Sequence, residues 1–175
     1  DAEYATGHLG GLNLNRQELL NVERVKIIAA GTSYYAGMVG AYLLESVARI
    51  PATAELASEL RYRNPIVERN TVYFAVSQSG ETADTLYAMR ELQRKGARVL
   101  GICNVVGSTI PRESDGGVYI HSGPEIAVAS TKAFTSQLTA FYLFTLMMGR
   151  MRHMGIESGL GFMNDLGAIP ELLQE

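Results

Sequence analysis

The segment Thr71-Val72-Tyr73-Phe74-Ala75-Val76 is followed directly by Ser77-Gln78-Ser79-Gly80-Glu81-Thr82. The first half is an apolar run rich in β-branched and aromatic residues, which is typical of a strand buried on both faces of a sheet. The second half gathers hydroxyls around one glycine, and a helical pattern follows over residues 81–95. Unpaired amides and the positive end of the helix dipole favour an anion at such a point. The segment therefore predicts a strand, an anion-binding loop and a helix.

The same order recurs on both sides of this segment. Residues 25–30 form a mostly apolar run, Gly31-Thr32-Ser33 follows it, and a helix is expected over residues 33–49. Further elements are expected at residues 52–56 (strand), 58–63 (one helical turn), 98–103 (strand), 108–113 (short helix), 117–121 (strand), 132–152 (long helix), 155–161 (break) and 163–173 (helix). Apolar strands that alternate with helices indicate a parallel sheet with helices on both faces. We therefore predict an α/β fold that is a three-layer α/β/α sandwich.

Size and composition limit the possible functions. The chain has 175 residues, 47% hydrophobic and 19% charged, which suits one compact domain. We expect a leader with a short helical segment over residues 1–22, a single domain over residues 23–175, and a chain that is part of a longer one. The net charge of −3 argues against a nucleic-acid partner. The apolar stretch 134–148 is too short to span a membrane. A single cysteine, Cys103, and no secretory signal pattern favour the cytoplasm.

Polar loops follow three of the predicted strands, at the edge where parallel sheets bind ligands. Gly31-Thr32-Ser33 lacks the spacing of a dinucleotide or Walker A loop, and it fits a plain helix cap equally well. The loop at residues 77–82 offers three hydroxyls and the Gln78 amide, four polar side chains where one cap would suffice, so a binding role is favoured. In the third loop, Ser130 either caps the long helix or lines a ligand site. Glu125 receives no catalytic role, because a lone loop carboxylate is more often a cap or an ion-pair partner.

The sequence offers no clear acid–base or metal machinery. Its histidines, His8, His121 and His153, are scattered and show no metal-ligand spacing, and no Ser/His/Asp order stands out. We predict no metal site, and a phosphate-binding site without catalytic groups of its own.

Taken together, the three loops resemble those of the sugar isomerase (SIS) domain family. The resemblance rests on Gly31-Thr32-Ser33-Tyr34, Ser77-Gln78-Ser79-Gly80-Glu81-Thr82-Ala83-Asp84-Thr85 and Ala129-Ser130-Thr131-Lys132-Ala133-Phe134-Thr135, with support from Glu59-Leu60-Arg61-Tyr62-Arg63, Ile102-Cys103-Asn104-Val105 and Arg112-Glu113-Ser114-Asp115. It covers nearly the whole chain from Leu9 onward. The third stretch narrows it to the first of two SIS halves in the glutamine–fructose-6-phosphate aminotransferases, which are also called glucosamine-6-phosphate synthases.

This resemblance implies a five-stranded parallel, flavodoxin-like sandwich in a homodimer. It also implies an enzyme that converts fructose-6-phosphate and glutamine into glucosamine-6-phosphate and glutamate, for amino-sugar biosynthesis, without a metal or organic cofactor. Carried over to this chain, the phosphate would be held by Ser77, Ser79 and Thr82, with Gln78 beside it.

The resemblance also implies which residues would contact the sugar. Ser33, Val128 and Ser130 would contact it, and Thr32 would shape the first loop. The chain departs from the family at Ala30, where a cysteine is frequent, but phosphate binding does not need a thiol there.

The family's Glu, His and Lys groups for ring opening and isomerisation belong to the second SIS half and the carboxyl-terminal tail. Its cysteine nucleophile belongs to a glutaminase domain, and this chain carries neither set. We therefore expect a substrate-binding fragment with no catalytic residue of its own. Two other interpretations stay open: a non-catalytic sugar-phosphate sensor that regulates a fused or partner domain, and a stand-alone phosphosugar isomerase that completes its site across a dimer.

Overall fold

Five parallel strands form one sheet in the order β2-β1-β3-β4-β5 in the computed structural model, which describes residues 3–127 and 129–172. The strands are β1 (Arg24–Ala29), β2 (Ala52–Leu56), β3 (Thr71–Ser77), β4 (Val99–Cys103) and β5 (Gly116–Tyr119). All four pairings are parallel. This strand order is the flavodoxin-like one, so the predicted α/β sheet is confirmed.

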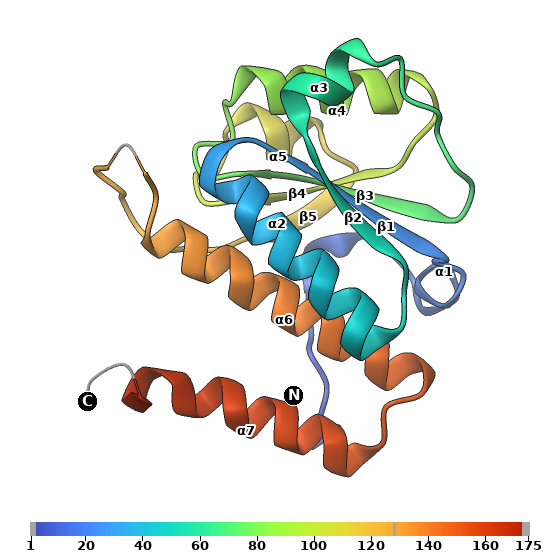
Figure 1. Ribbon diagram of the computed structural model, residues 1–175, viewed down its shortest axis with the longest axis vertical. Helices are drawn as coiled ribbons and strands as arrows, with labels where there is room; N and C mark the ends of the chain where they lie inside the picture. The colour runs from blue at the N-terminus through green and yellow to red at the C-terminus, as the bar shows by residue number, and fades with distance from the viewer. Residues whose placement is uncertain (1–2, 128, 173–175) are drawn as a thin grey trace.

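Helices cover both faces of the sheet, which gives the three predicted layers (Figure 1). One face carries α2 (Gly31–Leu43), its π-helical continuation η2 (Leu44–Ala48) and α6 (Lys132–Arg152). The other face carries α3 (Ala57–Tyr62), α4 (Ala83–Arg94) and α5 (Thr109–Glu113). The amino-terminal segment holds η1 (Gly10–Leu12) and α1 (Arg16–Leu20), and α7 (Ile156–Leu172) packs on α6.

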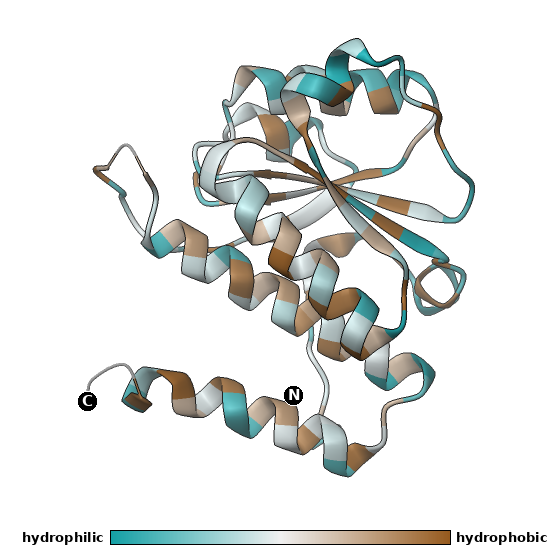
Figure 2. Cartoon of the chain, viewed as in Figure 1, coloured by the Kyte–Doolittle hydropathy of each residue, from teal (hydrophilic) through white to brown (hydrophobic). Residues whose placement is uncertain are grey.

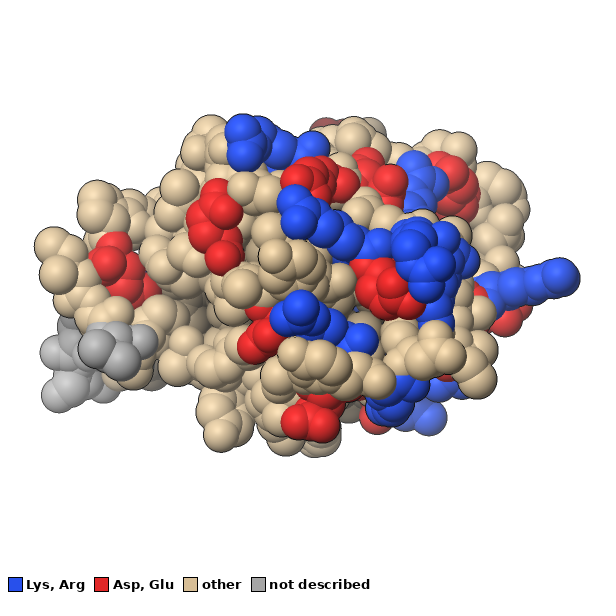
Figure 3. Space-filling model, turned by 90° about the horizontal axis from the view of Figure 1, so that it is seen from above, with Lys and Arg blue, Asp and Glu red and all other residues tan. Residues whose placement is uncertain are grey.

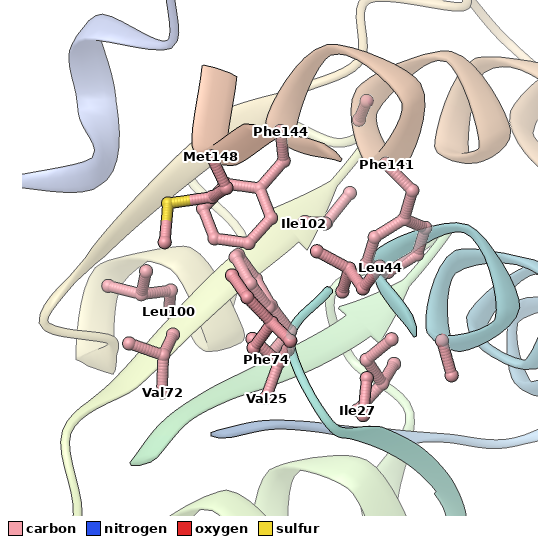
Figure 4. Packing of buried hydrophobic residues seen from close by; sticks show 14 of the residues in the cluster. Val25, Ile27, Leu44, Val72, Phe74, Leu100, Ile102, Phe141, Phe144 and Met148 are labelled. Carbon is pink, nitrogen blue, oxygen red and sulfur yellow. The ribbon is translucent and has the colours of Figure 1, made fainter. Parts of the chain in front are cut away.

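The core centres on β3, whose seven residues are all buried. Burial on both faces explains why this strand reads as a continuous apolar run rather than an alternating one. Phe74 packs edge-on against Phe144 and Phe141 of α6, with ring centroids 5.0 and 6.0 Å apart (Figure 4). Hydrophobic residues accordingly concentrate in the strands and on the helix sides that face them (Figure 2). The sheet thus forms a rigid base for the loops at its edge.

The outer face over α3 and α4 carries charges of both signs, which alternate across the surface (Figure 3). Arg90 pairs with Glu113 at 2.7 Å and Arg94 with Glu91 at 2.8 Å, and both are partly exposed. Such surface pairs contribute little to stability. Acidic side chains thus lie among the basic ones on this face (Figure 3).

One helix prediction is wrong. The glycine-rich stretch 155–161 predicts a break, but α7 runs through it from Ile156. Gly159 is buried, and a Cβ there would lie 2.7 Å from the carbonyl oxygen of Ala5 and 2.8 Å from Cδ of Arg150. The glycine therefore permits close packing against the amino-terminal segment, and this tertiary contact outweighs the roughly 1 kcal/mol by which glycine disfavours a helix.

Glycine also sets the closeness of α2 and α6. A Cβ on Gly40 would lie 2.6 Å from Cγ of Phe141, whose ring is fully buried against Phe74. The ring has no free space to move into, since protein interiors are close-packed.

We expect Gly40→Ala to lower the free energy of unfolding by about 1–3 kcal/mol, because the added methyl overpacks the α2–α6 contact. Gly167→Ala is the matched control, since Gly167 is a helical glycine of α7 and a Cβ added there would meet nothing within 4 Å. There the same change should raise stability by about 0.5–1 kcal/mol through helix propensity alone. Chemical denaturation of both variants measures the difference, and equal effects would contradict the packing explanation.

Candidate functional site

The candidate site lies where β1 and β3 end side by side. Ala29 pairs with Val76 in the parallel register, so the loops after these strands leave the sheet together. The chain after β1 enters α2 on one face, and the chain after β3 enters α4 on the other (Figure 1). This reversal is the point at which open α/β sheets bind ligands.

The loop after β3 is held in one shape by its own hydroxyls. Oγ of Ser77 accepts a hydrogen bond from the Gly80 amide at 3.0 Å and lies 2.8 Å from Oγ1 of Thr82. Oγ of Ser79 accepts from the Glu81 amide at 3.1 Å. The structure therefore brings the three hydroxyl residues predicted to hold a phosphate into one compact turn, with Ser77 buried and the other two half-buried.

Neighbouring loops fix this turn from outside. The Gly80 carbonyl accepts from the Ile110 amide at 2.9 Å, and the Glu81 carboxylate accepts from the Thr109 amide at 2.7 Å. Thr82, the residue before α4, makes no side-chain hydrogen bond to cap that helix. The first-turn amides of α4 are thus not used by a capping side chain, and their dipole favours an anion.

The first turn of α2, which follows β1 almost directly, meets the loop before α6. Oγ1 of Thr32 lies 3.1 Å from Oγ of Ser130, across 98 residues of sequence. Ser33 is buried, and its Oγ accepts from Nε2 of the buried Gln137 at 3.0 Å. Thr32 and Ser130 therefore come together as predicted partners of one site, whereas the Ser33 side chain is engaged with α6.

Glu125 caps α6. Its carboxylate accepts from the amides of Thr131 (2.8 Å), Lys132 (3.1 Å) and Ala133 (3.0 Å). The Thr131 amide, followed by that of Ala133, contributes most to holding the pKa of Glu125 at about 2, below the ordinary 4.5. The carboxylate therefore stays ionised down to that pH, and Ser130 is not the cap. Val128, predicted to contact the sugar, lies outside the described residues.

A cleft of about 510 Å³ opens beside these loops at the carboxyl ends of β3, β4 and β5. Its lining residues are Gln78, Asn104, Val105, His121, Gly123, Pro124 and Glu125. Another cleft of about 390 Å³ lies at the opposite edge of the sheet, and none of the predicted site residues line it. Gln78 is thus the predicted site residue that faces an open volume.

Asn104 is the residue that sequence reasoning missed. It is buried, its side chain accepts from the Ser122 amide at 2.7 Å and donates to the Gly123 carbonyl at 2.8 Å. Its own amide donates to the Gln78 carbonyl at 3.2 Å. The signal available in the sequence was an amide side chain directly after an apolar strand.

The described part of the chain gives little support for a metal site, a cysteine nucleophile or a membrane-spanning helix. Within it, no group of three or more His, Cys, Asp or Glu side chains is placed to hold a metal ion. Burial raises the pKa of the Cys103 thiol to about 12, so the residue is a core side chain rather than a nucleophile. None of the helices between residues 3 and 172 that the structure describes combines the length and apolar character needed to cross a membrane.

We expect Gly80→Ala to disrupt the turn. Gly80 has a φ of +65°, and a Cβ there would lie 1.9 Å from Oγ of Ser108. Gly96→Ala is the matched control, because Gly96 has a φ of +87° with open space around it. The control should lose about 1–2 kcal/mol from the left-handed backbone alone, and Gly80→Ala should lose at least about 1 kcal/mol more through the clash. Urea denaturation checks this, and equal losses would show that the turn tolerates a methyl.

Comparisons with known proteins agree with this geometry. A glutamine–fructose-6-phosphate aminotransferase (isomerizing) from Chlorobaculum tepidum is 49% identical over 164 residues, which cover 94% of this chain and 27% of that protein. A protein of the same name from Streptomyces coelicolor is 55% identical over 134 residues, covering 77% of this chain and 22% of that protein. The chain thus spans about a quarter of the length of these curated relatives.

A solved structure gives the same result. The C-terminal domain of glucosamine-fructose-6-phosphate aminotransferase from Francisella tularensis superposes with a TM-score of 0.86 at 38% identity, covering 91% of this chain and 45% of that chain. The family profile described as SIS domain matches residues 18–147, a range that includes all three loops. The chain therefore belongs to the SIS domain family.

Proposed function

We propose that this chain is the fructose-6-phosphate-binding SIS half of a glutamine–fructose-6-phosphate aminotransferase (isomerizing), which makes glucosamine-6-phosphate for amino-sugar biosynthesis in the cytoplasm. The observation that carries the proposal is the turn of Ser77, Ser79 and Thr82 at the start of α4. Support comes from relatives of that name at about half identity over most of the chain. In this proposal the glutaminase domain and a second SIS half belong to the rest of the protein.

The phosphate would be bound by neutral donors. No Lys or Arg lies within residues 77–82, so the donors are hydroxyls, the Gln78 amide and backbone amides at the start of α4. A neutral hydrogen bond contributes about 1 kcal/mol net, so four of them give about 4 kcal/mol, which corresponds to a Kd of about 1 mM. Such a site suits a substrate that must be released as product in every cycle.

The sugar would lie toward the loops after β1 and β5. The half-buried Thr32 and Ser130 hydroxyls, 3.1 Å apart, offer donors and acceptors for sugar hydroxyls. Ser33 would support this loop through Gln137, and Val128 remains a proposed contact.

The reaction itself would depend on groups elsewhere in the protein. Glu125 is a poor general base because both of its oxygens accept hydrogen bonds and its pKa is about 2. A general base works best with a pKa near the operating pH. Glu125 therefore holds structure rather than moving protons, and no catalytic residue is proposed for this chain.

Fructose-6-phosphate should shift the amide NMR signals of Ser77, Ser79 and Thr82 at millimolar concentration, because these residues would contact its phosphate. Fructose should leave them unmoved, and inorganic phosphate should reproduce part of the change. An absence of shifts at saturating fructose-6-phosphate would refute the proposal. Turnover of sugar phosphates by the purified 175-residue chain would favour the stand-alone isomerase instead.

In the full-length protein, Ser79→Ala with Thr82→Ala should raise the KM for fructose-6-phosphate about tenfold to a hundredfold, since two neutral hydrogen bonds are lost. Thr139→Ala is the control, because that exposed hydroxyl of α6 bonds only within its own helix, to the Thr135 carbonyl. A normal KM in the double variant would count against phosphate binding by this turn.

We also propose that the full protein is a homodimer. α2 exposes an apolar stripe at helical spacing formed by Tyr35 (60%), Met38 (48%), Val39 (39%) and Tyr42 (71%), while its opposite side packs on the sheet. Exposed stripes of this kind mark interaction surfaces.

Met38→Glu should convert the full-length dimer to a monomer, because a buried unpaired charge is costly at an interface. Ser158→Glu, on the exposed surface of α7, should leave the dimer intact. Light scattering measures the mass of each, and a Met38→Glu variant that stays dimeric would place the interface elsewhere.

A further inference from the structure

The loop between β5 and α6 is clamped at its base by one side chain. Oε1 of Glu125 accepts from the Thr131 amide and hydroxyl at 2.8 and 3.0 Å and from the Lys132 amide at 3.1 Å, while Oε2 accepts from the Ala133 amide at 3.0 Å. Nζ of Lys132 donates to the Pro124 carbonyl at 2.7 Å, which ties the two ends a second time. Glu125 and residues 131–133 are thereby held together at the base of the loop.

Ser130 directly precedes the clamped residues 131–133. Its Oγ lies 3.1 Å from Oγ1 of Thr32, in the first turn of α2. Ile126, directly after Glu125, is 98% exposed. Ile126 therefore does not fix the place of Ser130 by packing.

We propose that Glu125 is a positioning residue that sets the place of Ser130 against Thr32 and so acts on sugar binding without touching the substrate. The inference rests on the proposed function, because Ser130 matters only if a sugar phosphate binds between these loops.

The clamp requires a carboxylate rather than an amide. All four of its partners are donors, and an ionised carboxylate offers only acceptors. In Glu125→Gln, the amide oxygen can still accept from the partners of one former carboxylate oxygen. The NH₂ group then takes the place of the other oxygen and faces a donor, with which it cannot form a hydrogen bond. The charge that favours the amino end of α6 is lost as well. We therefore expect Gln to restore part of the function that Ala removes.

The test compares Glu125→Ala, Glu125→Gln, Ser130→Ala and the Glu125→Ala/Ser130→Ala pair in the full-length protein. Glu125→Ala should raise the KM for fructose-6-phosphate about fivefold, the size of one lost neutral hydrogen bond, with kcat within about threefold. Glu125→Gln should fall between it and the parent. Because Glu125 acts through Ser130, the pair should lose no more than about twofold beyond Ser130→Ala alone.

Asn15→Ala is the control. Asn15 caps α1 in the amino-terminal segment, with its Oδ1 2.9 Å from the Glu18 amide, so it removes a helix cap without touching the loops after β1, β3 or β5. Its KM should equal that of the parent. Additive losses in the Glu125→Ala/Ser130→Ala pair, or an unchanged KM in Glu125→Ala, would overturn the proposal. A general base at this position would show as a kcat lost in both Gln and Ala variants, which also overturns it.

A measurement without substrate separates this proposal from the function it rests on. The parent should show a nuclear Overhauser contact between Thr32 and Ser130, Asn15→Ala should keep it, and Glu125→Ala should lose it. Retention in Glu125→Ala would overturn the positioning role even if fructose-6-phosphate binds. If fructose-6-phosphate fails to bind the parent, the proposed function fails, while loss of the contact still supports the clamp. Should Glu125→Ala not fold, a weakened contact in Glu125→Gln supports the role and an unchanged one overturns it.

Discussion

The parallel pairing of β1 with β3 is the constraint on which the site depends. Parallel strands end at the same edge, so the register of Ala29 with Val76 starts two polar loops side by side. Their helices then diverge to opposite faces of the sheet, the arrangement in which open α/β sheets bind ligands. Phe74, packed against α6, anchors the strand beneath. The loops therefore need not supply the stability of the domain, and their residues are free to serve binding.

Hydrogen bonds tie the loops at this edge to one another. The Gln78 carbonyl accepts from the Asn104 amide, and the Asn104 side chain holds Ser122 and Gly123 at the start of the next loop. Glu125 holds the end of that loop, where Ser130 contacts Thr32 in the first turn of α2. Ordering of loops is a cost that binding otherwise bears. Because the loops are already held in place, binding would lose less free energy to ordering them. The affinity would then be closer to the full interaction energy, which is small when every donor is neutral.

The order of strands and helices was predictable because hydrophobic periodicity and the residues that begin or end an element are local properties of the sequence. The turn at residues 77–82 was predictable for the same reason: its polar side chains are contiguous and exceed what a cap needs. The partners of Ser33 and Thr32 were not, because Gln137 lies 104 residues away and Ser130 lies 98 residues away. A sequence can indicate that a polar residue is buried, but it does not show which group forms a hydrogen bond with it. The helix through residues 155–161 was missed because a tertiary contact at a glycine overrode local propensity.

A helix cap and a general base make opposite demands on a carboxylate. A base needs a free lone pair and a pKa close to the working pH, which desolvation or a like charge can provide. A cap needs its lone pairs filled by amides, and those amides stabilise the charge and lower the pKa. Glu125, with four donors and a pKa of about 2, meets the second demand and therefore fails the first. In the proposed function, the hydroxyls and amides at residues 77–82 would hold a sugar phosphate without changing its protonation, and proton transfer would require groups of a different kind from elsewhere in the protein.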